Sequence, residues 1–151
     1  MNPAILKRTN SDDLHFKSLI VLLDKDLSER NGTIQLAYDS YNLLDFIETV
    51  VVAYINDMPV GCGCFKKFSD DTIEIKRMFV TPLHRGKGIA SVILNELELW
   101  ATEMGYTNAV LETGTRHHEA IRLYQHLGYI ITENYGVYAD MEDSVCMQKS
   151  F

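Results

Sequence analysis

The chain has 151 residues, of which 46% are hydrophobic, and this fits one globular domain spanning residues 1–151 with its own core. Fourteen basic and 21 acidic residues give a net charge of −7, which argues against general nucleic-acid binding because that usually requires a basic face. No segment approaches the length of a transmembrane helix and residues 1–15 contain no apolar signal core, so we expect a cytoplasmic protein without membrane contact.

The first 80 residues predict a strand, a helix, a segment without clear periodicity and an antiparallel meander of three strands. Asn10 or Ser11 is expected to cap the helix. The predicted ranges, in chain order, are 4–9, 10–31, 34–47, 49–55, 60–68 and 72–80. The irregular 34–47 segment is either a wall of a substrate site or a surface helix and loop.

Three cysteines, Cys62, Cys64 and Cys146, are too few for a closed disulfide framework. Cys62 and Cys64 alternate within a predicted strand, so both side chains should face the same side. No further ligands lie at a spacing that suits a metal site. We therefore expect buried structural thiols and no metal.

The second half of the chain changes to helical periodicity and begins with a long apolar stripe that ends at Gly105. The predicted ranges are 89–104 (helix), 109–112 (strand), 119–127 (helix), 129–131 (strand) and 145–148 (strand). A strand, a helix and a strand in succession imply a parallel strand pair with a right-handed crossover. The whole pattern predicts an α+β protein with a mixed sheet of about seven strands flanked by about four helices.

A basic loop with two glycines joins the third strand of the meander to the long helix. Its residues are Arg85, Gly86, Lys87, Gly88, Ile89 and Ala90. Glycine lets the backbone approach a ligand closely, and the first turn of a helix offers unpaired N–H groups with partial positive charge. Because Arg85 and Lys87 add full charges, we predict a cradle for a phosphate-rich cofactor. The spacing matches neither a P-loop nor a Rossmann fingerprint.

The loop matches the pattern Arg/Gln-x-x-Gly-x-Gly/Ala, and its surroundings add to the match. The preceding strand ends in Met-Phe-Val, and the chain later reads Ala-Ile-Arg-Leu-Tyr at 120–124 and Gly-Tyr at 128–129. In these features the sequence resembles the GNAT superfamily of N-acetyltransferases, most strongly over residues 72–130. The resemblance implies a GNAT-like acyl-CoA N-acyltransferase fold, in which a largely antiparallel mixed sheet contains a splayed central strand pair.

The resemblance also implies acetyl-CoA as a co-substrate, with its pyrophosphate on the 85–90 loop and its pantetheine arm along the preceding strand. The implied cofactor-binding residues are Met78, Phe79, Val80, Arg85, Gly86, Lys87, Gly88, Ile89, Ala90 and His117. The backbone N–H of Phe79 or Val80 would polarise the thioester carbonyl. His117 stands where many relatives have an asparagine that touches the pantetheine arm. It could replace this contact, act as a base or, like His118, have no chemical role.

Acetyl transfer to an amine requires a base for the ammonium proton, a polarised carbonyl and an acid for the leaving thiolate. The resemblance implies Glu74 as the general base and Tyr124 as the general acid. Two structural alternatives stay open. Glu74 could form an ion pair with Lys66, Lys67 or Lys76, and Tyr124 could be a core aromatic residue of an amphipathic helix.

We therefore predict an N-acetyltransferase that moves an acetyl group from acetyl-CoA directly to a primary amine of a small molecule or peptide. The alternative is an acetyl-CoA-binding regulatory module without turnover. In a third interpretation, the basic loop is only a solvated turn. Members of the family are often dimers, so a homodimer is a further expectation.

Overall fold

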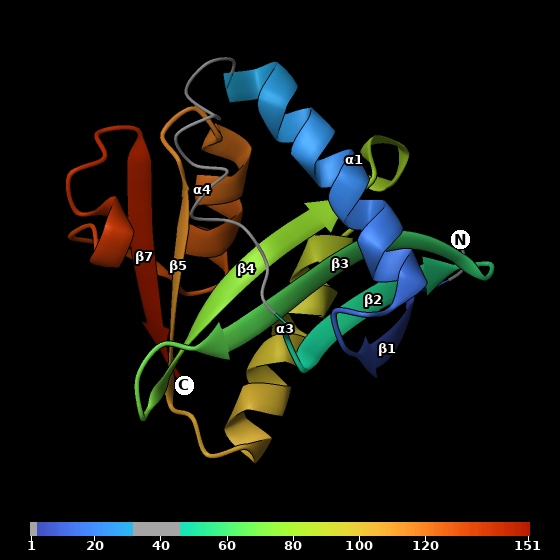
Figure 1. Ribbon diagram of the computed structural model, residues 1–151, viewed down its shortest axis with the longest axis horizontal. Coiled ribbons are helices and arrows are strands. Elements are labelled where there is room, and N and C mark those ends of the chain that lie inside the picture. The colour runs from blue at the N-terminus through green and yellow to red at the C-terminus, as the bar shows by residue number, and fades with distance from the viewer. Residues whose placement is uncertain (1–2, 32–45) are drawn as a thin grey trace. The chain divides into compact units, whose positions relative to one another are not determined.

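The computed structural model describes residues 3–31 and 46–151. The elements in chain order are β1 (Ile5–Thr9), α1 (Leu14–Asn31), β2 (Thr49–Ile55), β3 (Met58–Lys67), β4 (Thr72–Val80), η1 (Pro82–His84), α3 (Ile89–Glu103), β5 (Asn108–Gly114), α4 (His118–His126), β6 (Ile130–Thr132), η2 (Gly136–Tyr138) and β7 (Ser144–Ser150) (Figure 1). Within these residues, no helix is long and apolar enough to cross a membrane.

The strands form one mixed sheet in the order β1-β2-β3-β4-β5-β7-β6. β4 and β5 are parallel, whereas the β1–β2, β5–β7 and β6–β7 pairs are antiparallel. The predicted α+β class and its seven strands are therefore confirmed. Three of the expected helices, α1, α3 and α4, are present, and most of the irregular 34–47 segment lies outside the described residues.

The chain divides into two compact units. The first unit consists of Met1–Cys64 and Arg77–Leu97, and the second consists of Phe65–Lys76 and Glu98–Phe151. β3, β4 and α3 each contribute residues to both units. The prediction of a single domain over residues 1–151 stays a prediction.

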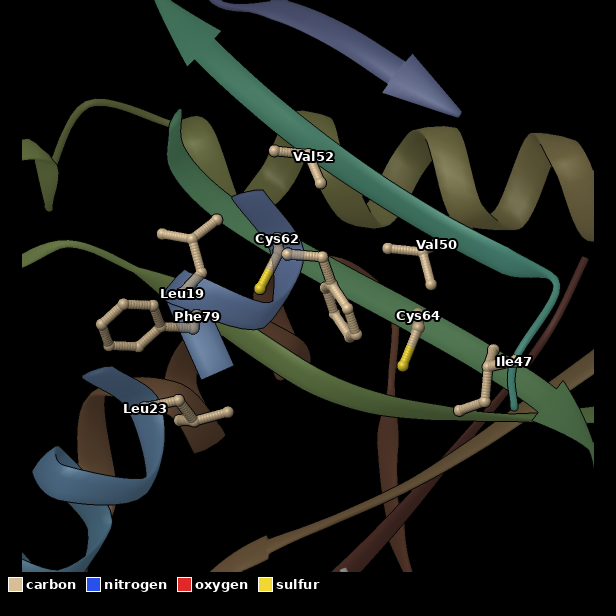
Figure 2. Close-up of a cluster of buried hydrophobic side chains, with 9 residues drawn as sticks. Leu19, Leu23, Ile47, Val50, Val52, Cys62, Cys64 and Phe79 are labelled. Carbon is tan, nitrogen blue, oxygen red and sulfur yellow. The ribbon is translucent and has the colours of Figure 1, made fainter. Parts of the chain in front are cut away.

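The core of the first unit lies between α1 and the strands β2, β3 and β4 (Figure 2). Its buried residues are Phe16, Leu19, Leu23, Ile47, Val50, Val52, Cys62, Cys64 and Phe79. Cys62 and Cys64 thus face the same side, as predicted, and all three cysteines are free and buried. Burial raises the pKa of the Cys62 thiol far above its ordinary value, so this thiol stays protonated and unreactive.

The other face of β3 carries two glycines that bring α3 close to the strand. A Cβ at Gly63 would overlap the Met78 sulfur and lie 3.0 Å from a Leu97 methyl group. A Cβ at Gly61 would lie 3.0 Å from an Ile93 methyl group. Larger residues would push the helix away, so these glycines set the distance between the sheet and the helix that follows the basic loop.

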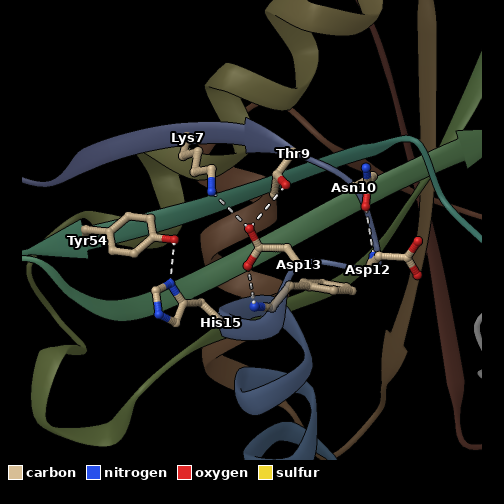
Figure 3. Close-up of polar contacts among 8 residues, drawn as sticks. Lys7, Thr9, Asn10, Asp12, Asp13, His15 and Tyr54 are labelled. Carbon is tan, nitrogen blue, oxygen red and sulfur yellow. Dashed lines mark hydrogen bonds and ion pairs between the residues drawn. The ribbon is translucent and has the colours of Figure 1, made fainter.

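Asp13 caps the start of α1 (Figure 3). Its Oδ1 accepts a hydrogen bond of 3.0 Å from the Phe16 N–H, and its Oδ2 lies 3.2 Å from the Lys7 ammonium. The predicted caps were therefore wrong by two to three positions. Asn10 accepts the Asp12 N–H instead and Ser11 accepts the Ile47 N–H, so both order the turn before the helix.

The second unit places β5 and β7 in register from Asn108 opposite Ser150 to Gly114 opposite Ser144. A buried acid of α3, Glu98, links this helix to Tyr129 and to β7. Its carboxylate accepts hydrogen bonds from the Tyr129 hydroxyl at 2.9 Å and from the Lys149 ammonium at 2.8 Å. Because both oxygens have a partner, the buried charge is compensated.

Candidate active site

The central parallel pair is hydrogen-bonded over a short stretch only. β4 and β5 pair from Thr72 opposite Asn108 to Ile75 opposite Leu111. β4 nevertheless continues to Val80, and β5 continues to Gly114. The hydrogen-bonded register of this parallel pair therefore ends at Ile75 and Leu111, before either strand ends.

Two features shape the end of β4 in the first unit. Arg77 has a φ of +57°, a left-handed conformation that is rare for a residue inside a strand. After β4, the Thr81 N–H donates to the Val60 carbonyl at 2.9 Å, and η1 leads into the basic loop. The 78–80 segment (Met78, Phe79 and Val80) thus lies between a left-handed residue and a residue that is hydrogen-bonded to β3.

The basic loop has the backbone of an anion cradle. Gly86 and Gly88 have φ values of +78° and +80°, and no atom lies within 4 Å of a Cβ built at either position. The Val92 N–H bonds the Gly88 carbonyl at 3.2 Å, which is a first-turn hydrogen bond of α3. The N–H groups of Ile89 and Ala90 precede it, as at any helix start. Open space at the two glycines, next to a helix start, suits a phosphate group.

The Arg85 side chain turns toward its own strand. Its Nε donates to the Val80 carbonyl at 2.8 Å, and its guanidinium lies 5.6 Å from the centre of the Phe79 ring. Its Nη2 lies 3.5 Å from the Asp26 carboxylate of α1. Lys87, in contrast, is exposed at the tip of the loop. The two cations of the loop therefore differ in role, because Arg85 is hydrogen-bonded to its own strand and Lys87 is exposed to solvent.

Glu74 lies in the second unit and is almost completely buried, with 6% of its surface exposed. Its Oε2 accepts a 2.7 Å hydrogen bond from the Tyr135 hydroxyl. The ammonium groups of Lys66 and Lys76 each lie 3.9 Å from its Oε1. The ion pairs that the sequence left as an alternative are therefore formed by two of the three candidates, whereas Lys67 pairs with Asp70.

Tyr124, on α4, is buried. Burial raises the pKa of its phenol far above the ordinary value, and the nearby charge of Glu112 raises it further. Its ring meets the Tyr129 ring edge-on, with 5.9 Å between the ring centres. The residue is thus both a packed aromatic and a phenol that keeps its proton over the physiological range.

Glu112 is a candidate that the sequence analysis missed. It lies on β5 just after the last residue paired with β4, and its Oε2 accepts a 2.7 Å hydrogen bond from the Ser144 hydroxyl. Burial raises its pKa to about 7, against the lowering effects of Ser144 and Lys76. The sequence feature that could have pointed to Glu112 is an acid directly after three apolar residues of a central strand.

His117 directly precedes α4 and faces β5. Its N–H donates to the Gly114 carbonyl at 3.0 Å, and its Nδ1 lies 3.5 Å from the Thr113 hydroxyl. It is partly buried, whereas His118 is exposed. Among the residues described, no group of three or more His, Cys, Asp or Glu side chains could hold a metal ion.

The predicted residues fall into two sets. The first unit contains the 78–80 segment and the 85–90 loop. The second unit contains Glu74, Tyr124 and His117, together with Glu112. Within the second unit the charges of Glu74 and Glu112 influence each other, and the charge of Glu112 reaches Tyr124.

Solved structures share this fold. A Klebsiella pneumoniae protein proposed to be an acyl-CoA N-acyltransferase is 27% identical, with a TM-score of 0.80 and 97% of both chains covered. A GNAT family acetyltransferase from Elizabethkingia anophelis, solved with acetyl-CoA bound, is 18% identical, with a TM-score of 0.73 over 100% of both chains. The predicted GNAT-like acyl-CoA N-acyltransferase fold is therefore confirmed.

The family itself is also shown. The chain matches the Acetyltransferase (GNAT) family over residues 16–129 and belongs to it. An IAA acetyltransferase of Azospirillum brasilense is 31% identical over 138 residues, which cover 86% of this chain and 89% of that protein. Other curated relatives match over less of their length. The rat N-acetyltransferase family 8 member 2 is 38% identical over 65 residues, which are 43% of this chain and 29% of that protein.

Proposed function

We propose that this chain is an acetyl-CoA-dependent N-acetyltransferase that acts on a primary amine of a small molecule or peptide. The observation that carries the proposal is the cradle at the start of α3, where Gly86 and Gly88 hold left-handed conformations beside open space. Membership of the GNAT family supports it, as does a structural neighbour with acetyl-CoA bound. Bound acetyl-CoA would supply the acetyl group as an activated thioester.

The residues of the first unit would bind and orient this co-substrate. The backbone amides of the 85–90 loop and the exposed Lys87 suit the pyrophosphate, because both offer positive charge to an anion. The backbone of the 78–80 segment would pair with the pantetheine arm, and the N–H of Phe79 or Val80 would donate to the acyl oxygen. In the second unit, His117 is proposed as a further contact of the pantetheine arm.

The residues of the second unit would move the protons. The resemblance assigns the amine proton to Glu74, whose two oxygens are engaged by Tyr135, Lys66 and Lys76. Glu112 is the stronger candidate, because a carboxylate with a pKa of about 7 accepts a proton readily near neutral pH. We propose that Glu112 takes the amine proton. In this proposal Glu74 acts only through its charge, which contributes to the raised pKa of Glu112.

Tyr124 would supply the proton that the leaving thiolate needs. Its raised pKa keeps the phenol protonated, so Oη can donate when charge develops on the sulfur. The proposal includes a homodimer and a cytoplasmic location.

The test measures coenzyme A binding by calorimetry and thiol release from acetyl-CoA with a panel of primary amines. We expect binding and amine-dependent thiol release. Binding without turnover on any amine would favour the regulatory module, and absence of both would refute the proposal. Glu74→Gln and Glu112→Gln then separate the two bases, because only the variant that lacks the true base should lose the pH dependence of the rate.

A further inference from the structure

Two arginines flank the 78–80 segment, and each is paired with an acid on α1. Arg77 Nη1 lies 2.6 Å from Asp24 Oδ1, and Arg85 Nη2 lies 3.5 Å from Asp26 Oδ2. All four residues belong to the first unit. The strand end that is proposed to hold the acyl donor is therefore tied to α1 on both of its sides.

The Arg77 pair holds a strained part of the strand. Only 9% of the Arg77 side chain is exposed, and its backbone is left-handed at a φ of +57°. Its carbonyl accepts the Cys62 thiol at 3.5 Å. A guanidinium this deeply buried is costly unless a carboxylate compensates it, so Asp24 makes this conformation tolerable.

The Arg85–Asp26 pair lies at the other end of the 78–80 segment. Arg85 reaches back to the Val80 carbonyl through Nε at 2.8 Å, and its guanidinium covers the Phe79 ring. The Nη2 of the same guanidinium lies 3.5 Å from the Asp26 carboxylate. The carboxylate therefore fixes the direction of an arginine that in turn fixes the backbone of the last residue of β4.

We propose that Asp24 and Asp26 are positioning residues, which hold the 78–80 segment in the shape that receives the acyl donor. This inference rests on the proposed function, because it assumes that the segment binds acetyl-CoA. Neither acid touches the reacting atoms. They act through Arg77 and Arg85.

A simple electrostatic view predicts the opposite sign. Coenzyme A carries several negative charges, so removing a nearby carboxylate should make the surroundings more positive and tighten binding. If Arg85 were a direct phosphate ligand, release from Asp26 would free it and tighten binding further. In the positioning view, loss of either carboxylate weakens binding. The sign of the change thus separates the two views.

The experiment compares Asp24→Asn, Asp26→Asn and the double variant with Glu96→Gln. Glu96 is a matched control, since it forms a 2.7 Å ion pair with Arg8 in the same unit and its loss makes the same change in charge. We expect coenzyme A dissociation constants that rise about threefold in each single variant and about tenfold in the double variant. Unchanged or tighter binding would overturn the inference.

A second measurement needs no bound ligand. The Thr81 N–H bonds the Val60 carbonyl at 2.9 Å, directly after the held segment. Its hydrogen exchange in the free protein should be faster in both aspartate variants than in Glu96→Gln. Equal exchange in the aspartate variants and in Glu96→Gln would contradict the inference, whether or not the wild-type chain binds coenzyme A. Absence of coenzyme A binding by the wild-type chain would refute the proposed function instead.

A charge swap tests the pairing itself. Arg77→Asp alone places two acids together and should loosen the segment. Combining it with Asp24→Arg restores the pair, and aspartate tolerates the left-handed backbone better than most residues. We expect the double swap to recover slow Thr81 exchange and most of the coenzyme A affinity. No recovery would mean that the pair does not act as a positioning device.

Discussion

Burial of the Glu112 carboxyl raises its pKa to about 7, which leads to a specific pH dependence. Below this pH the group is protonated and cannot accept the amine proton, so the rate should rise with pH through about 7. Glu112→Gln should remove that inflection and lower kcat about 100-fold. The measurement is a pH–rate profile for both forms. If Glu74→Gln removes the inflection and Glu112→Gln keeps it, Glu74 is the base.

The same shift predicts that Glu112 destabilises the folded chain at high pH. Its folded pKa of about 7 exceeds the unperturbed value of 4.5, so the folded form binds more protons between these pH values. The free energy of unfolding should therefore decrease as pH rises through this range. Glu112→Gln should be more stable than the wild type at pH 8, by at most about 3 kcal/mol. Urea unfolding at pH 5 and pH 8 checks this, and an equal difference at both would contradict it.

Tyr124 and Tyr129 are packed neighbours that should respond differently to loss of a hydroxyl. Tyr124→Phe should lower kcat about 10- to 100-fold and leave coenzyme A binding unchanged, because the variant cannot protonate the leaving thiolate. Tyr129→Phe removes the 2.9 Å hydrogen bond to buried Glu98 and should instead cost about 2 kcal/mol of stability. Steady-state kinetics and urea unfolding of both variants give the comparison. A similar kcat for the two would argue against an acid role for Tyr124.

The start of α3 depends on backbone conformations that only glycine adopts easily. Gly88→Glu should abolish coenzyme A binding, since it places bulk and negative charge in the cradle. Gly105→Glu is the matched control, because Gly105 also has a positive φ, +96°, with no atom within 4 Å of a built Cβ. Both variants should lose about 1 kcal/mol of stability, but only Gly88→Glu should lose affinity in calorimetry. Equal affinity in both would refute the assignment of the loop.

The start of α1 depends on Asp13. Burial tends to raise its pKa, but hydrogen bonds from Phe16, Lys7 and Thr9 outweigh this and leave the pKa lowered. Asp13 thus stabilises the fold fully above the unperturbed value of 3.8, and this contribution is lost as pH falls through the lower folded pKa.

Asp13→Ala should therefore cost about 1 kcal/mol at pH 7, measured by urea unfolding, and less at strongly acidic pH. Asp12→Ala is the control, because Asp12 is exposed and takes part in the capping contacts only through its backbone N–H. A loss as large in the control would mean that the cap adds nothing.

For the whole molecule, the sequence predicted the class of fold well and the local partners less well. The change from alternating to helical periodicity between β4 and α3 was visible because one face of each element is buried. The cap of α1 was misplaced, because Asn10, Ser11, Asp12 and Asp13 are all good capping residues and only the structure shows that the Asp13 carboxylate accepts the Phe16 N–H. Glu112 was missed because its acidity depends on burial and on Ser144, 32 residues away.

The sequence by itself determined the order of strand, glycine loop and helix, and with it the family of the chain. These features are local, because the left-handed glycines and the apolar helical stripe depend on residues that are close together in the sequence. Only the tertiary structure decided what the charged groups do. Arg85 is turned back toward Val80 and toward Asp26, 59 residues away, and Glu74 is held by Tyr135, 61 residues away. The energy of a charge depends on burial and on its partners, and folding alone brings those partners together.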